Sequence, residues 1–187
     1  DLLTLARFEE RVAVSSRTNI AAADLLAEAA HEARLLAKEK GLAIDTSVSP
    51  SLTVYSDRQG LQQVLRILVD NAVRYTPEGG AITLGARDVD NCVEFRVQDT
   101  GPGIPEQHRQ HIFERFYRAD TARSRTEGGT GLGLAIAREI VDMLDGKIEV
   151  AGKSSGAGTT IVFWIPQRAG RAGHPASSRS EPAAENE

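Results

Sequence analysis

The sequence predicts an α+β fold built in two layers, with helices packed on a sheet. Apolar residues recur at helical spacing in three long stretches, residues 21–40, 58–75 and 131–144. Alternating apolar and polar residues, which are typical of strands, fill much of the sequence between these stretches. Of the 187 residues, 41% are hydrophobic, so one buried core can be built.

The first segment of the chain, residues 1–14, is predicted to be the end of an amphipathic helix, and residues 15–20 a linker. Four apolar side chains of this helix recur at helical spacing: Leu2, Leu5, Phe8 and Val12. Such a helix packs either on its own domain or on a partner helix. The next helix, over residues 21–40, is predicted to stop at Gly41, because glycine favours the position just after a helix C-terminus.

The helix predicted over residues 58–75 separates two kinds of side chain. Strands are expected before it, at 42–48 and 53–55, and Ser56-Asp57 offers a helix cap. One face is apolar and should be core: Leu61, Leu65, Leu68 and Ala72. The adjoining flank carries Val64, Ile67, Asn71, Arg74 and Tyr75. This flank therefore presents an amide oxygen, a guanidinium and an aromatic ring to one ligand.

The remaining elements complete a mixed sheet covered on one face by three helices. They are a hairpin over 81–89 and 92–97 around Asp90-Asn91, a short helix over 105–111, the helix over 131–144, and strands over 147–150 and 159–166. Residues 168–187 are rich in Ala, Gly, Ser, Pro and charge, which predicts a disordered tail.

Two glycine-rich turns bracket an arginine-rich segment. The first turn follows Asp99, and the second, Gly129-Thr-Gly131-Leu-Gly133, leads into a helix. Turn N–H groups at a helix start form an anion site, and glycine lets the backbone approach a ligand closely. Ionised Asp99 only accepts hydrogen bonds, so it suits an exocyclic amino group. The pattern predicts a purine at one end and phosphates at the other, unless Asp99 merely bonds the N–H groups of its own turn.

Motifs in fixed order resemble the boxes of sensor histidine kinases. They are the N box Asn71-Ala-Val-Arg-Tyr75, a first glycine box Asp99-x-Gly101-x-Gly103, an F box Phe113-x-x-Phe116, a second glycine box Gly129-x-Gly131-x-Gly133, and a weaker last box Gly156-Ala-Gly158-Thr-Thr160. The resemblance covers residues 20–167 and implies the α/β sandwich known as the Bergerat fold. The glycines do not fit a Rossmann site, because no hydrophobic strand precedes them and Leu134 occupies the last glycine position.

The resemblance implies a Mg·ATP site. Asn71 would bind Mg²⁺, Arg74 a phosphate, Tyr75 the base or ribose, and Asp99 the adenine amino group; Asn71 and Arg74 would be the catalytic residues. The implied contact residues are Asn71, Arg74, Tyr75, Asp99, Gly101, Gly103, Ile104, Phe113, Phe116, Arg118, Gly129, Thr130, Gly131, Leu132, Gly133, Leu134 and Thr160. The alternative for Asn71 and Arg74 is an ordinary exposed helix surface.

The F box and the segment after it resemble the anchor and lid over ATP in this family. Phe113 and Phe116 are spaced to share one helical face, and core packing is the alternative role for both. The lid would run from about Tyr117 to Gly128 and carry Arg118, Arg123 and Arg125. Several cations on one loop suit a polyanion, and such loops usually become ordered on binding.

Two expected groups are absent from the sequence. Related ATPases of this fold carry a Glu one turn before the metal Asn, where this chain has Ile67, so rapid hydrolysis is not expected. Histidine kinases often have Asn there, so Ile67 departs from their pattern too. The phosphoacceptor H box is also missing: His31-Glu32-Ala-Arg34 resembles one, but Leu36 replaces its Pro and the helix over 1–14 precedes it.

The sequence therefore predicts the catalytic ATP-binding domain of a two-component sensor histidine kinase. Residues 1–14 would be a remnant of the second dimerisation helix. The partners implied are an H-box dimerisation domain, in the parent chain or a separate one, and a response regulator. The parent protein would be a membrane-bound homodimer with this domain in the cytoplasm. A regulatory nucleotide-binding module and a serine kinase of the same fold are the alternatives.

Composition adds limits of its own. The net charge of −4 gives no reason to expect nucleic acid as a partner. The single Cys92 cannot form an internal disulfide, which fits a reducing compartment. There is no run of eighteen apolar residues that would span a membrane.

Overall fold

The computed structural model describes residues 17–118, 131–152 and 158–167. Its helices are α2 (Ala22–Ala37), the short 3-10 helix η1 (Lys38–Lys40), α3 (Arg58–Tyr75), α4 (Glu106–Arg109) and α5 (Gly133–Met143). Its strands are β1 (Thr18–Ala21), β2 (Ala43–Val48), β3 (Thr53–Ser56), β4 (Ala81–Val89), β5 (Cys92–Asp99), β6 (Lys147–Val150) and β7 (Thr160–Pro166).

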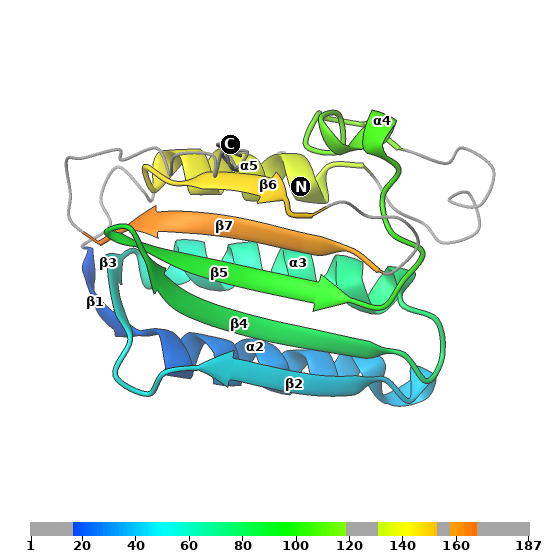
Figure 1. Cartoon of the computed structure of the whole chain (residues 1–187), viewed down its shortest axis with the longest axis horizontal. Helices are drawn as coiled ribbons and strands as arrows, with labels where there is room; N and C mark the ends of the chain where they lie inside the picture. The colour runs from blue at the N-terminus through cyan, green and yellow to red at the C-terminus, as the bar shows by residue number, and fades with distance from the viewer. Residues whose placement is uncertain (1–16, 119–130, 153–157, 168–187) are drawn as a thin grey trace, which may run out of the picture.

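Within the described residues, five strands form one mixed sheet in the order β2-β4-β5-β7-β6. Strands β2 and β4 are parallel, and the other neighbouring pairs are antiparallel. Helices α2, α3 and α5 cover one face of this sheet (Figure 1). The predicted two-layer sandwich, with a mixed sheet and three helices on one face, is confirmed.

Strand β1 is not revealed by the sequence periodicity. It pairs antiparallel with β3 in a separate two-stranded sheet, from Thr18 opposite Ser56 to Ala21 opposite Thr53. Residues 18–20 of the predicted linker therefore belong to a strand. Four residues are too few to show a repeating pattern, so only the pairing with β3, about thirty-five positions later in the chain, identifies this strand.

Helix α3 is held at its start and along its length. The Asp57 carboxylate accepts a hydrogen bond of 2.6 Å from the Gly60 N–H, as the predicted cap requires. The four predicted core positions are all buried: Leu61, Leu65, Leu68 and Ala72. Val64 differs from its prediction, because it is fully buried rather than part of the ligand flank. The helix thus places its last turn, with the N-box residues, at a fixed end of the sheet.

The hairpin of β4 and β5 carries the first glycine box to that same end. Val89 pairs with Cys92, and the two turn residues Asp90 and Asn91 have φ angles of 47° and 67°. These left-handed values suit the tight hairpin turn that the Asp-Asn pair predicts. Strand β5 then runs the length of the sheet to Asp99, whose backbone N–H donates to the Thr159 carbonyl at 2.9 Å.

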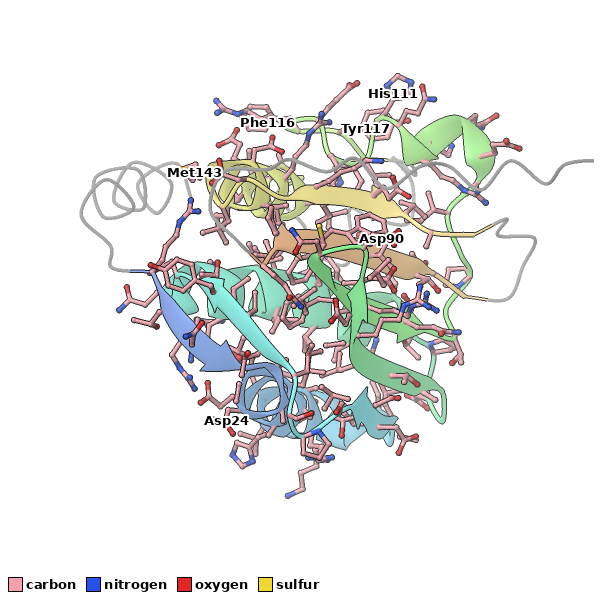
Figure 2. The ribbon with its side chains drawn as sticks, turned by 60° about the vertical axis from the view of Figure 1, so that its left-hand side comes forward. Asp24, Asp90, His111, Phe116, Tyr117 and Met143 are labelled. Carbon is pink, nitrogen blue, oxygen red and sulfur yellow. The ribbon has the colours of Figure 1, made fainter. Side chains whose placement is uncertain are left out.

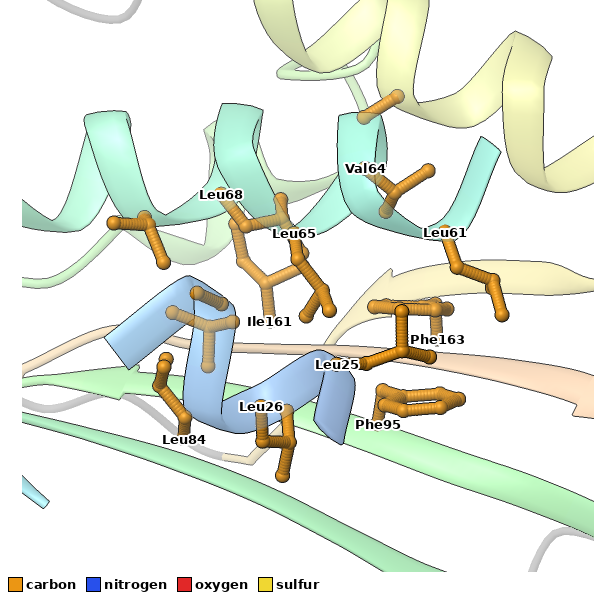
Figure 3. Packing of buried hydrophobic residues seen from close by; sticks show 14 of the residues in the cluster. Leu25, Leu26, Leu61, Val64, Leu65, Leu68, Leu84, Phe95, Ile161 and Phe163 are labelled. Carbon is orange, nitrogen blue, oxygen red and sulfur yellow. The ribbon is translucent and has the colours of Figure 1, made fainter. Parts of the chain in front are cut away.

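The core joins the two elements that carry the site. The rings of Phe95 on β5 and Phe163 on β7 are stacked with their centroids 4.9 Å apart. Figure 3 shows the leucines of α3 pointing toward these rings and toward Ile161, with Leu25 and Leu26 of α2 completing the cluster. Because a close-packed core is rigid, the ends of α3 and β5 keep a fixed position relative to each other.

Several predictions fall outside the described residues. They concern the helix over 1–14, the lid arginines Arg123 and Arg125, Gly129 and Thr130 of the second glycine box, and the tail over 168–187. None of the helices that the structure describes combines the length and the apolarity needed to cross a membrane.

Candidate functional site: a cavity at the end of the sheet

A cavity of about 1020 Å³ opens where α3 and β5 end. Its wall is formed by the last turns of α3, by the loop over residues 99–105 and by the start of α5. This volume is sufficient for a ligand the size of a nucleotide. The predicted site residues that line it are Asn71, Arg74, Tyr75, Asp99, Gly101, Gly103, Ile104, Arg118, Gly131, Gly133 and Leu134.

Asp99 is a buried carboxylate on the cavity wall, and its side chain is part of the local turn. Its Oδ1 accepts hydrogen bonds from the N–H of Gly101 at 2.8 Å and from the N–H of Thr159 at 3.1 Å. Only 7% of the residue is exposed. The turn role considered from the sequence is therefore correct for Oδ1, and a ligand role would fall to Oδ2.

Burial raises the pKa of the Asp99 carboxyl above its ordinary value, although hydrogen bonds from Gly101 and Thr159 act in the opposite direction. The ionised form is thus destabilised in the folded domain. The stability linked to this group is present below its unfolded pKa and is lost as the pH rises through its folded pKa. A ligand that donates a hydrogen bond to the ionised carboxylate offsets part of that cost.

Gly101 lets the loop after β5 lie directly on the end of α3. A Cβ at this position would be 2.8 Å from Asp99 Oδ1 and 2.9 Å from the backbone oxygen of Tyr75. Both distances are shorter than a carbon atom tolerates, so any side chain would push the loop away from the helix. Glycine here preserves the shape of the cavity at its Asp99 end.

Three predicted residues on α3 reach the cavity together. Asn71 and Arg74 are partly buried, and Tyr75 is 49% exposed. Asp70, which was not a predicted site residue, also lines the cavity and forms an ion pair with Arg74 at 3.4 Å. Ion pairs of this kind near the surface contribute little stability.

The oxygen donors of this wall suit a metal that arrives with phosphates. Mg²⁺ prefers hard oxygen ligands and usually keeps water and phosphate oxygens around it. Asn71 and Asp70 supply an amide and a carboxylate oxygen side by side in the sequence. In the part of the chain that the structure describes, no group of three or more His, Cys, Asp or Glu residues is placed to hold a metal. The protein would therefore contribute one or two ligands to the metal.

Lys40 is a cavity residue that the sequence did not single out. Its Nζ donates to three backbone oxygens at the end of α3: Val73 at 2.8 Å, Arg74 at 2.7 Å and Thr76 at 3.2 Å. A positive charge at a helix C-terminus is stabilised by the helix dipole and satisfies unpaired carbonyls. Lys40 comes from η1, so no local motif links it to the N box, and only the fold reveals the contact.

Replacing Lys40 by Met is expected to lower the free energy of unfolding by about 1 to 3 kcal/mol, because charge-assisted hydrogen bonds to three carbonyls are lost. Urea unfolding followed by circular dichroism measures the change. Lys38 in the same short helix is exposed and makes a matched control, for which Lys38→Met should leave stability within about 0.5 kcal/mol. Equal effects of the two substitutions would contradict the capping role.

The F box differs from its prediction. Residues 111–116 form turns rather than a helix, so Phe113 and Phe116 do not share a helical face. Phe113 is 8% exposed and belongs to the core, whereas Phe116 is 65% exposed and has a φ of 64°. Figure 2 shows Phe116 at the surface. The left-handed residue turns the chain so that the Phe116 N–H donates to the Gly131 oxygen at 2.9 Å, and neither ring lines the cavity.

The start of α5 forms the other end of the cavity. Gly131, Gly133 and Leu134 line it, whereas Leu132 is buried and does not. Helix α5 begins at Gly133, and the residue at its N-cap, Leu132, makes no side-chain capping hydrogen bond. N–H groups at a helix start combined with the helix dipole form an anion site. The second glycine box thus places such a site on the wall of the same cavity as Asp99.

The last glycine box brings a neighbour of the predicted residue to the site. Thr160 pairs with Gln98 in the sheet and does not line the cavity. Thr159 lines it and donates its N–H to Asp99. Successive residues of an extended chain point to opposite sides. The predicted contact residue Thr160 is therefore off by one position, and its neighbour Thr159 lines the cavity instead.

Neither Ile67 nor His31 lines the cavity, although Ile67 lies next to Gly133, which does. Ile67 is partly buried and packs against the hydrophobic core, so this position offers no carboxylate to activate water. His31 is exposed on α2 and does not line the cavity. Its position agrees with the view that it is a solvated helix residue.

Comparison with known proteins identifies the family. Residues 56–169 match the HATPase_c family model, described as histidine kinase-, DNA gyrase B- and HSP90-like ATPase. The chain is 37% identical over 172 residues to the sensor histidine kinase YkoH of Bacillus subtilis, covering 90% of this chain and 36% of YkoH. It is 39% identical over 127 residues to the kinase BaeS of Escherichia coli K12, covering 68% of this chain and 27% of BaeS.

Solved structures agree with these relatives. The nucleotide-free catalytic domain of the histidine kinase ThkA superimposes with a TM-score of 0.71 at 30% identity, covering 82% of this chain and 97% of that domain. Full-length ShkA in complex with AMPPNP gives 0.72 at 33% identity, covering 88% of this chain and 35% of ShkA. The chain spans only about a quarter to two fifths of the curated relatives first compared. The chain therefore belongs to the HATPase_c family, and it is the ATP-binding catalytic domain of a bacterial sensor histidine kinase.

Proposed function

We propose that this domain binds ATP together with Mg²⁺ and donates the γ-phosphoryl group to a histidine on an H-box dimerisation domain. That domain lies either in the rest of the parent chain or in a separate protein. The observation that carries the proposal is that one cavity is lined both by a buried acceptor, Asp99, and by the N-terminus of helix α5. The adenine amino group and the phosphates of ATP require these two kinds of partner.

In this proposal the chain acts by positioning and by charge. Asp99 accepts from the adenine amino group, Tyr75 lies against the base or ribose, and the phosphates are bound by Arg74 and Arg118, which both line the cavity. Asn71 supplies an oxygen to the metal, which would neutralise charge on the phosphates. Phosphoryl transfer depends mainly on such alignment and electrostatic stabilisation. Without a base at Ile67, the γ-phosphate would be kept for the histidine rather than for water.

The remainder of the parent protein follows from its relatives, which are named as sensor kinases. We propose a membrane-bound homodimer, with this domain on the cytoplasmic side and a response regulator as the final phosphate acceptor. The neighbouring coding sequence tests these assignments, because they require either an in-frame H box upstream or a separate H-box protein encoded next to this one.

The decisive experiment adds a separate H-box helical hairpin to this chain with radiolabelled ATP and Mg²⁺. Acid-labile phosphate should appear on the hairpin, and none should appear on the chain by itself. Label on His31, or on any other residue of the isolated chain, would argue against the proposal. A hairpin whose H-box histidine is replaced by Gln is the control.

A nucleotide-binding module without phosphotransfer is the second candidate, and Ile67 favours it because this position is polar in many kinases of the family. In that case calorimetry would show ATP binding while the hairpin stays unlabelled. A serine kinase of the same fold would instead give acid-stable phosphate on a protein substrate.

Asn71→Ala is expected to remove chiefly the magnesium-dependent part of ATP affinity. We expect affinity in the presence of Mg²⁺ to fall by about tenfold, with little change in EDTA, because one of few protein ligands of the metal is lost. Titration calorimetry in the two buffers measures both values. Asn19→Ala, in an exposed position of β1, is the control. An equal loss with and without metal would contradict the metal role.

A further inference from the structure

We propose that His108 is a positioning residue, which acts through Tyr117 to place Arg118 beside the nucleotide phosphates. This inference rests on the proposed binding of ATP. His108 Nδ1 lies 2.6 Å from the hydroxyl oxygen of Tyr117, and all three residues line the cavity. The bond links α4, which follows the first glycine box, to the chain that leaves the F box.

His108 stands on a helix with a fixed position. Helix α4 has a single turn and little stability of its own. The neighbouring Arg109 holds it through two backbone carbonyls, with Nη1 donating to Gly152 at 2.7 Å and Nε to Ile104 at 3.2 Å. Ile104 lies in the loop that follows Asp99, so the contact of Arg109 with Ile104 fixes the position of His108 relative to that loop.

The segment that carries Arg118 is held by its backbone, by an ion pair between Arg115 and Glu139, and by the ring of Tyr117, which packs against the core. The Tyr117 N–H donates to the Glu114 oxygen at 3.3 Å, and the Phe116 N–H donates to the Gly131 oxygen at 2.9 Å. Both bonds fix the chain before Tyr117 Cα, and the Tyr117 ring packs against the core and beside His111. The bond to His108 holds the hydroxyl end of this ring, and so restrains the residue that directly precedes Arg118.

The donor and acceptor can be assigned from the other ring nitrogen. The amide nitrogen of Gln107 lies 3.2 Å from His108 Nε2, so the amide donates and Nε2 accepts. In the neutral ring Nδ1 then carries the proton and donates to the Tyr117 oxygen.

His111 offers a matched comparison. Its ring centroid lies 5.4 Å from that of Tyr117, close to the 6.1 Å separation of His108 and Tyr117. Its Nδ1, however, pairs with Glu114 Oε1 at 2.8 Å, and His111 does not line the cavity. Figure 2 shows His111 and Tyr117 next to each other near α4. Removing His111 therefore takes away ring packing of a similar kind without the hydrogen bond.

The test is a double-mutant cycle of His108→Ala and Tyr117→Phe, with ATP and adenosine affinities measured by calorimetry. Each single variant should weaken ATP binding about threefold to tenfold and leave adenosine binding within about twofold, since only phosphate contacts are disturbed. The double variant should bind ATP no more weakly than the single variant with the lower ATP affinity, because both substitutions remove the same hydrogen bond. His111→Ala should match the unsubstituted chain for both ligands.

Unchanged ATP affinity, losses that multiply in the double variant, or equal losses for adenosine and ATP would each overturn the inference. The last result would mean that His108 shapes the whole cavity. If the unsubstituted chain bound neither ligand, the proposed ATP binding itself would be refuted, and this result is distinct from the other three. Thermal melting of each variant verifies that it is folded.

Discussion

Asp99→Asn is expected to lower ATP affinity about a hundredfold while the domain stays folded. The amide keeps an oxygen that can accept from the N–H groups of Gly101 and Thr159, as Oδ1 of Asp99 does. It replaces the second oxygen by a donor, which would face the donor of the adenine amino group. Loss of a charge-assisted hydrogen bond, with two donors opposed, accounts for about 2 to 3 kcal/mol. Titration calorimetry measures the affinity.

The same variant separates binding from stability. Because burial raises the pKa of Asp99, its ionised form costs the empty domain stability at pH values above that pKa, and the amide removes this cost. The melting temperature at pH 7 should therefore stay close to that of the original chain or exceed it. Preference for ATP over GTP should shrink, since GTP has a carbonyl at this position. Asp88→Asn, on the exposed part of β4, is the control; undiminished ATP affinity in Asp99→Asn would refute the adenine assignment.

Gly158→Ala is expected to be the most disruptive glycine-to-alanine change in the part of the chain that the structure describes. A Cβ at Gly158 would overlap the backbone oxygen of Asp99, and it would approach the Thr100 Cα to 3.1 Å. The φ of 91° also disfavours any side chain. We expect a loss of at least about 3 kcal/mol in the free energy of unfolding and no measurable ATP binding, because Asp99 must move.

Gly152→Ala is the control that isolates the overlap. Gly152 has a similar φ of 83°, but a Cβ there would meet nothing within 4 Å. Its cost should be limited to the backbone conformation, about 1 to 2 kcal/mol, with ATP affinity retained. Chemical unfolding and calorimetry measure both variants. Similar outcomes for the two glycines would show that the contact with Asp99 is unimportant.

Local sequence patterns were sufficient to predict the elements whose residues follow a regular period or a known turn type. Helix α3 has the predicted bounds, because its apolar residues recur over eighteen positions and Asp57 caps it. The hairpin followed from the residue types at Asp90 and Asn91, which tolerate left-handed backbone. Asp99 and the residues of the N box reach one cavity because β5 and α3 end at the same edge.

Contacts between distant segments could not be derived in this way. Strand β1 depends on pairing with β3, and Lys40 finds the end of α3 only after the chain has folded. Phe116 and Thr160, which were predicted to contact the ligand, do not line the cavity for a related reason. Their predictions assumed an unbroken helix or one phase of an alternating strand, and a single left-handed residue or a shift of one position changes which side each residue faces.

The β1–β3 pair and the cavity lie at opposite ends of α3, as Figure 1 shows for the strands. With eighteen residues, the helix is about 27 Å long, and this length separates the β1–β3 pair from the cavity. Any segment joined ahead of residue 17 enters the domain beside the β1–β3 pair, at the start of α3. A rotation of the domain by about 10° about that end would move the far end of α3 by about 5 Å, roughly the pitch of one helical turn. Under the proposed function, such a rotation would change the distance between the γ-phosphate and a separate acceptor without breaking a contact inside the domain.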